Sequence, residues 1–214
     1  MEKQVSASVI NRLPRYYRYL GELLNCGIER ISSKELSQRM GVTASQIRQD
    51  LNCFGGFGQQ GYGYNVEYLY GEIAGILGLD KRYKAILVGA GNIGHALTRN
   101  TNFEKRGFSL IGIFDNDPEK IGMKIRDLTV LDYSTIKGFV AKEEPTMAIL
   151  SVPKAVVNQV AQDLIDCGIR AFLNFSYAEI ASEENIVVEN IHLGDSLMRL
   201  SYKISETNNL KNKD

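Results

Sequence analysis

Cysteine and histidine are scarce in this sequence, and each shortage argues against a class of protein. The three cysteines, Cys26, Cys53 and Cys167, are too scattered for a disulfide framework or a zinc site, so we interpret them as core or surface thiols. The histidines are His95 and His192. A dehydrogenase needs a proton donor or acceptor at the substrate carbonyl, usually on a second catalytic domain, and 214 residues leave no room for one. We therefore expect a protein that is not an enzyme and that binds no metal.

Long apolar runs are also missing. No segment approaches the roughly 20 apolar residues that cross a bilayer, and the opening MEKQVSASVI lacks the apolar stretch of a signal peptide. We therefore expect a cytoplasmic protein without a membrane partner. An apolar content of 44% and a charged content of 23% are those of an ordinary globular protein, and the length suggests two modest domains.

The sequence lacks net charge, but its charges are unevenly divided. Residues 1–66 contain eight lysines and arginines against five acidic residues, a net charge of +3, which leaves −3 for the remainder. DNA affinity depends on where cations face phosphates rather than on a total. The excess permits DNA binding but does not demonstrate it.

Apolar spacing and capping signals predict three helices in the first 52 residues. Apolar residues three and four apart from Ser8 to Asn25 predict the first helix, with Pro14 near its first turn or at a kink. S-x-x-E from Ser32 and T-x-x-Q from Thr43 are capping boxes that begin the next two, and Gly41 ends the former. Two short helices joined by a glycine turn behind a packing helix are typical of a helix-turn-helix.

The third helix is the predicted DNA-reading helix. Its polar residues can face outward while Ile47 and Leu51 face inward; arginine suits guanine, glutamine suits adenine and serine suits phosphate. Any solvent-facing helix has a similar polar face, so the prediction of DNA reading also depends on the wing that follows. FGGFGQQGYGYNV predicts two short strands, anchored with help from Tyr62 and Tyr64. The predicted DNA-binding residues are Ser45, Gln46, Arg48, Gln49, Gln59, Gln60 and Tyr62.

A different pattern follows a helix expected from Glu67 to Leu77. Four apolar strands separated by helix-length segments are predicted in KAILVGAGNIG, FSLIGIFDNDP, TMAILSVPK and IRAFLNFS. Strands that are apolar on both faces imply a parallel sheet covered on both sides. We predict an α/β chain: an N-terminal winged helix-turn-helix domain (1–78), a Rossmann-like doubly wound parallel sheet domain (79–192) and a C-terminal helix and tail (193–214).

The glycines of the second domain predict a dinucleotide site. Gly89, Gly91 and Gly94 spell G-x-G-x-x-G at a strand-to-helix turn, where the backbone can approach a pyrophosphate. Asp115 ends the next strand, where a carboxylate accepts hydrogen bonds from the adenosine ribose. This carboxylate would repel a 2′-phosphate and no arginine follows it, so NAD(H) is favoured over NADP(H). Asp117 either adds to the repulsion or is a solvated turn acid.

Two later turns fall at the carboxyl edge of the predicted sheet, where ligands of this fold bind. Ser151-Val152-Pro153 and Asn174-Phe175-Ser176 are either nicotinamide contacts or ordinary loop residues. His95 is expected to have a surface or packing role. The predicted cofactor-binding residues are Gly89, Ala90, Gly91, Asn92, Ile93, Gly94, Asp115, Asn116, Ser151, Val152, Pro153, Asn174 and Phe175.

A further apolar stripe lies near the C-terminal end of the sequence. Leu193, Leu197, Leu200 and Ile204 are spaced four, three and four residues apart on a predicted terminal helix. The stripe packs either on its own sheet or on a second subunit. A DNA reader of this type usually needs two copies for paired half-sites.

Five segments, taken in order, closely resemble the Rex family of redox-sensing transcriptional repressors: ISSKELSQRMGVTASQIRQDL, FGGFGQQGYGYNV, VGAGNIG, FDNDPEKIG and AFLNFS. The resemblance implies a homodimer with swapped terminal helices that leaves an inverted-repeat operator when NADH binds, with NAD+ competing. It implies a signalling role for Arg18, whose usual acidic partner is replaced here by His192. Gln49, Gln59 and Gln60 depart from a more basic family pattern.

Two other functions stay open at this point. One is a small NAD-dependent oxidoreductase whose N-terminal module docks a partner, against which the missing catalytic acid argues. The other is a module for coenzyme A or another nucleotide, which a titration with NADH would distinguish. Under the Rex interpretation, oxidised and reduced cofactor differ at the nicotinamide, so we expect discrimination near Phe175 and the terminal helix.

Overall fold

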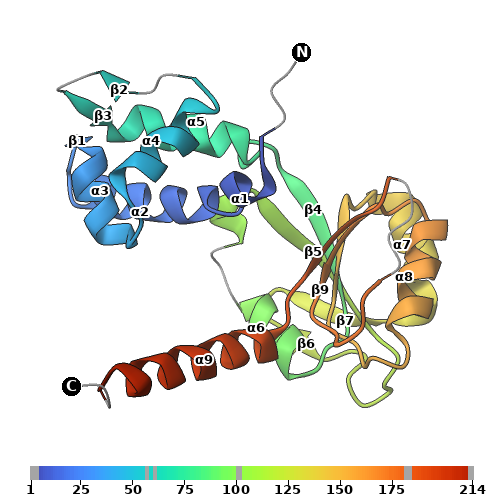
Figure 1. Cartoon of the computed structure of the whole chain (residues 1–214). Coiled ribbons are helices and arrows are strands. Elements are labelled where there is room, and N and C mark those ends of the chain that lie inside the picture. The colour runs from blue at the N-terminus through green and yellow to red at the C-terminus, as the bar shows by residue number, and fades with distance from the viewer. Residues whose placement is uncertain (1–4, 56–57, 60–61, 100–102, 181–184, 212–214) are drawn as a thin grey trace. The chain divides into compact units, whose positions relative to one another are not determined.

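The computed structural model describes residues 5–55, 58–59, 62–99, 103–180 and 185–211, which form two compact units that meet in sequence between Lys81 and Arg82 (Figure 1). This division falls slightly later than the predicted boundary at residue 78. The C-terminal segment from residue 193 is part of the second unit.

The first unit begins with two helices, α1 (Ala7–Ile10) and α2 (Leu13–Asn25), in place of the single helix predicted from Ser8. Pro14 lies in the first turn of α2, as predicted, where its missing N–H costs no helical hydrogen bond. Three further helices follow: α3 (Ser33–Met40), α4 (Ala44–Asn52) and α5 (Val66–Ile76). A small antiparallel sheet has the order β1-β3-β2, with β1 at Arg30–Ile31, β3 at Gly63–Asn65 and β2 at Gly58–Gln59.

The predicted caps of α3 and α4 have different outcomes. Ser32 and Glu35 form the complete capping box at α3, and Gly41 ends that helix in the left-handed conformation at φ 63°. Thr43 accepts a hydrogen bond from the backbone N–H of Gln46, as predicted. The reciprocal bond of a capping box, from the backbone N–H of Thr43 to the Gln46 side chain, was predicted wrongly. The side chain of Gln46 donates to Asp50 instead, at 2.9 Å.

The core of the first unit combines the inner faces of its helices with the wing. Tyr64 of β3 is buried in this core, as expected of a wing anchor. Tyr62 is 70% exposed, so the prediction that it anchors the wing was wrong; the guanidinium of Arg30 lies 5.8 Å from its ring centroid. The fully buried residues include Leu13, Tyr16, Leu20, Leu36, Met40, Ile47, Leu69 and Ile73.

The second unit is built on one sheet with the order β10-β9-β8-β4-β5-β7-β6. The four predicted strands are β4 (Tyr83–Val88), β5 (Phe108–Asp115), β8 (Met147–Leu150) and β9 (Ala171–Asn174). They are continued by β10 (Val187–Asn190), β7 (Leu128–Asp132) and the antiparallel edge strand β6 (Lys124–Ile125). The parallel part has the doubly wound order of a Rossmann fold, which confirms the predicted fold class.

Alternate residues of the central strand β4 face opposite sides of the sheet. Ile86 and Val88 pack in one core cluster and Ala85 and Leu87 in another. Figure 1 shows two helices together on one side of the sheet, α7 (Ile136–Glu143) and α8 (Val157–Asp166). The remaining helices of the unit are α6 (Asn92–Arg99), the 3-10 turns η1 (Glu104–Arg106) and η2 (Tyr133–Thr135), and the terminal α9 (Leu193–Lys211).

Candidate nucleotide site and DNA-facing surface

The glycine turn between β4 and α6 contains three glycines with different surroundings. Gly89 has a φ of 96°, and a Cβ there would lie 2.5 Å from the carbonyl oxygen of Ser151. A Cβ on Gly94 would overlap the carbonyl oxygen of Gly89. A Cβ on Gly91 would have no atom within 4 Å. Gly89 and Gly94 therefore serve close packing, whereas Gly91 faces open space beside the N-terminus of α6.

Asp115, at the end of β5, is attached to this turn. Its side chain is 7% exposed, and its Oδ2 accepts a hydrogen bond from the backbone N–H of Ala90 at 2.7 Å. Its Oδ1 accepts one from the backbone N–H of Asp117 at 2.9 Å. Burial raises the pKa of Asp115, but these two hydrogen bonds and the nearby Lys120 outweigh it and hold the pKa below its usual value. The carboxylate is thus ionised and held beside the glycine turn.

A cavity of about 740 Å³ opens at this edge of the sheet. Its volume lies within the range of about 300–1,000 Å³ that is typical of small-molecule and cofactor sites. The predicted site residues that line it are Gly89, Gly91, Ile93, Asp115, Asn116, Ser151, Val152, Pro153 and Phe175. Most of the predicted site therefore comes together around one hollow.

Four predicted cofactor residues are not part of the cavity lining: Ala90, Asn92, Gly94 and Asn174. Ala90 and Gly94 are buried in the turn, and the Ala90 N–H is already donated to Asp115. Asn174 is fully buried, and its amide group donates to the Ala178 carbonyl at 2.7 Å and to Asn190 Oδ1 at 2.8 Å. In the structure Asn174 holds the loop after β9 in place.

Several lining residues were not named as candidates from the sequence: Val88, Lys120, Tyr133, Lys154, Val156, Val160 and Tyr177. Asp117 and Ser176, for which the sequence left a ligand contact and an ordinary turn role open, also line the cavity. Lys120 is the most informative, because its Nζ lies 3.3 Å from Asp115 Oδ2 and 3.2 Å from Asp117 Oδ2. It lies five residues after Asp115, in the turn DPEK, whereas the sequence prediction considered only an arginine directly after Asp115.

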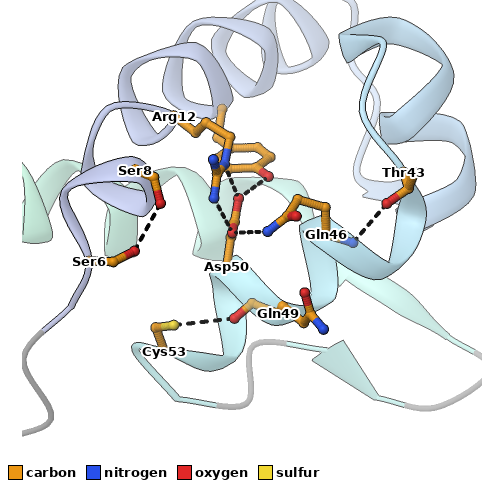
Figure 2. A network of polar contacts seen from close by, with 9 residues as sticks. Ser6, Ser8, Arg12, Thr43, Gln46, Gln49, Asp50 and Cys53 are labelled. Carbon is orange, nitrogen blue, oxygen red and sulfur yellow. Dashed lines mark hydrogen bonds and ion pairs between the residues drawn. The ribbon is translucent and has the colours of Figure 1, made fainter.

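In the first unit, Asp50 ties the predicted reading helix α4 to α2 (Figure 2). Its side chain is 1% exposed and receives hydrogen bonds from Arg12 Nε at 2.6 Å, Arg12 Nη2 at 2.8 Å and the Tyr16 hydroxyl at 2.8 Å. Gln46, from the preceding turn of α4, adds the fourth. Burial raises the pKa of Asp50, yet the hydrogen bonds from these three side chains prevail and lower it.

The predicted DNA-binding residues of α4 are unequally accessible. Ser45, Arg48 and Gln49 are exposed, whereas Gln46 is half-buried with its amide group bound to Asp50. The Arg48 guanidinium donates to Ser33 Oγ at 2.9 Å, which links α4 to α3. In the wing, Tyr62 is exposed and Gln59 belongs to β2, while Gln60 lies outside the described residues.

The two predicted signalling residues belong to different units. Arg18 is exposed on α2, with its guanidinium 5.8 Å from the Tyr19 ring centroid. His192 precedes α9, stacks on Tyr177 with 6.1 Å between ring centroids, and has its Nδ1 3.9 Å from Asp195 Oδ2. Among the described atoms, its buried Nε2 has no hydrogen-bond partner.

Known proteins are similar to this chain along nearly its whole length. Two family models match, one described as "Putative DNA-binding protein N-terminus" over residues 4–52 and one as "CoA binding domain" over residues 80–178. The redox-sensing transcriptional repressor Rex of Thermoanaerobacter pseudethanolicus is 54% identical over 95% of this chain and 91% of the relative. That of Caldanaerobacter subterraneus subsp. tengcongensis is 55% identical over 94% of this chain and 90% of the relative.

Solved structures are also similar to this chain along nearly its whole length. The crystal structure of RSP with β-NADH superposes with a TM-score of 0.90 at 48% identity, covering 99% of this chain and 100% of that one. RSP with β-NAD+ and operator DNA gives a TM-score of 0.90 at 52% identity, covering 98% and 97%. Within the described residues, no helix is long and apolar enough to cross a membrane, and no group of three or more potential metal ligands is found.

Proposed function

This chain belongs to the Rex family of redox-sensing transcriptional repressors, and we propose that it binds operator DNA as a homodimer and leaves it when NADH binds, with NAD+ competing. It is a regulator rather than an enzyme. We place its action in the cytoplasm. The relatives' named function and the nucleotide cavity of the second unit support the same conclusion.

One observation carries the nucleotide part of the proposal: Gly91 faces open space at the start of α6, next to the ionised Asp115. The N-terminus of a helix attracts a pyrophosphate through its free N–H groups and its dipole. Asp115 accepts hydrogen bonds from the adenosine ribose. Bound NADH or NAD+ supplies the redox signal through its nicotinamide, for which Val152 and Phe175 in the same cavity are our proposed contacts.

The DNA part of the proposal rests on α4 and the wing. The exposed Ser45, Arg48 and Gln49 are the proposed readers on α4, and Gln59, Gln60 and Tyr62 the proposed wing contacts. Gln46 stays a proposed DNA-binding residue, although its amide group would have to leave Asp50 to reach a base. Arg18 and His192 are the proposed signalling residues.

A mobility-shift titration tests the proposed function. Purified protein is titrated against an inverted-repeat operator duplex with NADH, with NAD+ or with no nucleotide. A ligand shifts an equilibrium only by its difference in affinity between two states, and a hundredfold difference is about 2.7 kcal/mol. We expect NADH to weaken binding at least tenfold and NAD+ to preserve it, with a scrambled duplex as control. Equal affinity with and without NADH would contradict the proposal.

The homodimer part of the proposal uses the terminal helix. The predicted stripe of α9 is exposed: Leu193, Leu197, Leu200 and Ile204 are each between 53% and 67% accessible. Exposed apolar surface of this extent marks an interaction site. The second unit also has an apolar hollow of about 260 Å³ on one sheet face, lined by residues that include Leu87, Leu97, Phe108, Ile149 and Leu173. We propose that the stripe of one subunit packs on its partner.

Replacing Leu197 and Leu200 together by glutamate is expected to produce a monomer. Buried carboxylates without partners would cost more than the dimer gains from two leucines. Light scattering after size exclusion measures the mass, and operator affinity should fall about a hundredfold because paired half-sites are no longer bound together. Ser205→Glu, on another face of α9, is the control and should remain dimeric. A dimeric double variant would place the interface elsewhere.

A further inference from the structure

A cation lies at the ribose end of the nucleotide cavity, where the sequence predicted only the acidic residues Asp115 and Asp117. Lys120 Nζ is 3.3 Å from Asp115 Oδ2 and 3.2 Å from Asp117 Oδ2, and all three residues line the cavity. Asp115 is the ribose-binding carboxylate of the proposed function. An ammonium group in contact with that carboxylate therefore lies within reach of the 2′ substituent of the ribose.

The turn after β5 fixes Asp117 in this arrangement. Its Oδ1 accepts a hydrogen bond from the backbone N–H of Glu119 at 3.0 Å, and its carbonyl accepts those of Lys120 and Ile121 at 3.0 and 3.1 Å. The remaining oxygen, Oδ2, is directed at the ammonium group. Asp117 is thus held in place by the turn and paired with Lys120, and it is not a freely solvated acid.

The contact restrains a charge that could otherwise bind a phosphate. The hydrogen bond that Lys120 donates to Asp117 is the largest cause of its raised pKa, so the ammonium group is charged at neutral pH. Lysine is a good point-charge ligand for phosphate. Here one positive charge faces two negative charges, which leaves the three side chains with a net charge of −1.

We propose that Asp117 determines coenzyme specificity by holding Lys120: with Asp115 it neutralises the cation beside the ribose site, which could otherwise bind a 2′-phosphate, and so excludes NADPH. The preference for NADH then depends on a restrained lysine and not on the lack of a cation. This inference rests on the proposed NADH-binding function and deepens it by naming the residue that selects between the two reduced coenzymes.

The expected effect follows from charge and exposure. Without the Asp117 charge, the ammonium group is shared only with Asp115 and can bind a phosphate as a further partner. Asp117 and Lys120 side chains are 37% and 34% exposed, so solvent screens the interaction and the gain is modest. We expect Asp117→Asn to raise the affinity for NADPH relative to NADH about tenfold. Asparagine retains the oxygen that accepts from Glu119.

Fluorescence titrations of the full-length protein with NADH and with NADPH test the inference. The variants are Asp117→Asn, Lys120→Met and the double variant, with Glu119→Gln as an exposed neighbouring acid for control. We expect the tenfold gain in Asp117→Asn, its loss in the double variant, and no change of the ratio in Glu119→Gln. Thermal melts establish that each variant is folded.

The possible results distinguish a failure of this inference from a failure of the proposed NADH-binding function. If the wild-type protein binds no NADH, the proposed function itself is overturned. If it binds NADH but Asp117→Asn leaves the NADPH to NADH affinity ratio unchanged, the inference is overturned. A gain that persists without Lys120, or that Glu119→Gln reproduces, also overturns it, because the lysine would then have no part in the selection.

Discussion

Replacing Gly91 by leucine is expected to abolish NADH binding while the protein remains folded. Its Cβ would have no neighbour within 4 Å, so the substitution meets no protein atom. The added side chain would instead fill the space in front of the α6 N-terminus, where the proposed pyrophosphate site lies. Losing charge-assisted hydrogen bonds there costs about 3 kcal/mol or more, roughly a hundredfold in affinity.

Isothermal titration with NADH measures this loss, and a thermal melt without nucleotide should give a midpoint close to that of the wild type. The operator complex of the variant should no longer respond to NADH. Gly138→Ala is the matched control, because Gly138 in α7 also has open space around it and lies outside the cavity. It should bind NADH normally and be stabilised by up to about 1 kcal/mol. Unchanged NADH affinity in Gly91→Leu would place the pyrophosphate elsewhere.

Replacing Asp50 by alanine is expected to destabilise the first unit strongly. The change removes the acceptor of four hydrogen bonds from Arg12, Tyr16 and Gln46, and leaves the fully buried Tyr16 without the partner of its hydroxyl. Breaking a buried pair costs about 3–5 kcal/mol. The Arg12 side chain is 28% exposed, so water can solvate it, and we expect a loss at the lower end of this range.

Urea denaturation measures this loss, with Asp80→Ala as control because Asp80 is an exposed acid of the same unit. Operator binding should also fall sharply, since the orientation of α4 depends on Asp50, while NADH binding in the second unit should persist. A variant of Asp50 with wild-type stability and operator affinity would show that α4 is held by other contacts.

The same carboxylate predicts a pH dependence of stability. The folded protein lowers the pKa of Asp50, so its contribution is fully present above the unfolded pKa of about 3.9. The contribution is lost as the pH falls through the lower folded pKa. Denaturation curves from pH 7 to pH 3 should therefore show an acid loss of stability that is smaller in Asp50→Asn. Equal losses in both proteins would assign the acid sensitivity to other groups.

Local features were predicted well because they depend on residues close together in the chain. The Ser32–Glu35 box and the Gly41 cap arise from hydrogen bonds between residues a few positions apart, and the glycines of the β4–α6 turn follow from one strand-to-helix turn. The strands β6 and β7 were not predicted, since they are short and only Ile125 and Val130 among their residues are buried.

The sequence by itself determined the division into two units, the class of doubly wound parallel sheet, and the glycine and aspartate signature of a nucleotide site. Only the tertiary structure decided that Asp50 meets Arg12, 38 residues away, and that Gln46 turns inward to it. Only the tertiary structure placed Lys120 against Asp115 and buried Asn174 in its loop. Periodicity and caps record local geometry. The contact of Asp50 with Arg12 depends instead on how distant segments pack. The contacts of Gln46 and Lys120 depend on which of several partners within reach each side chain meets, and the residue pattern does not specify that.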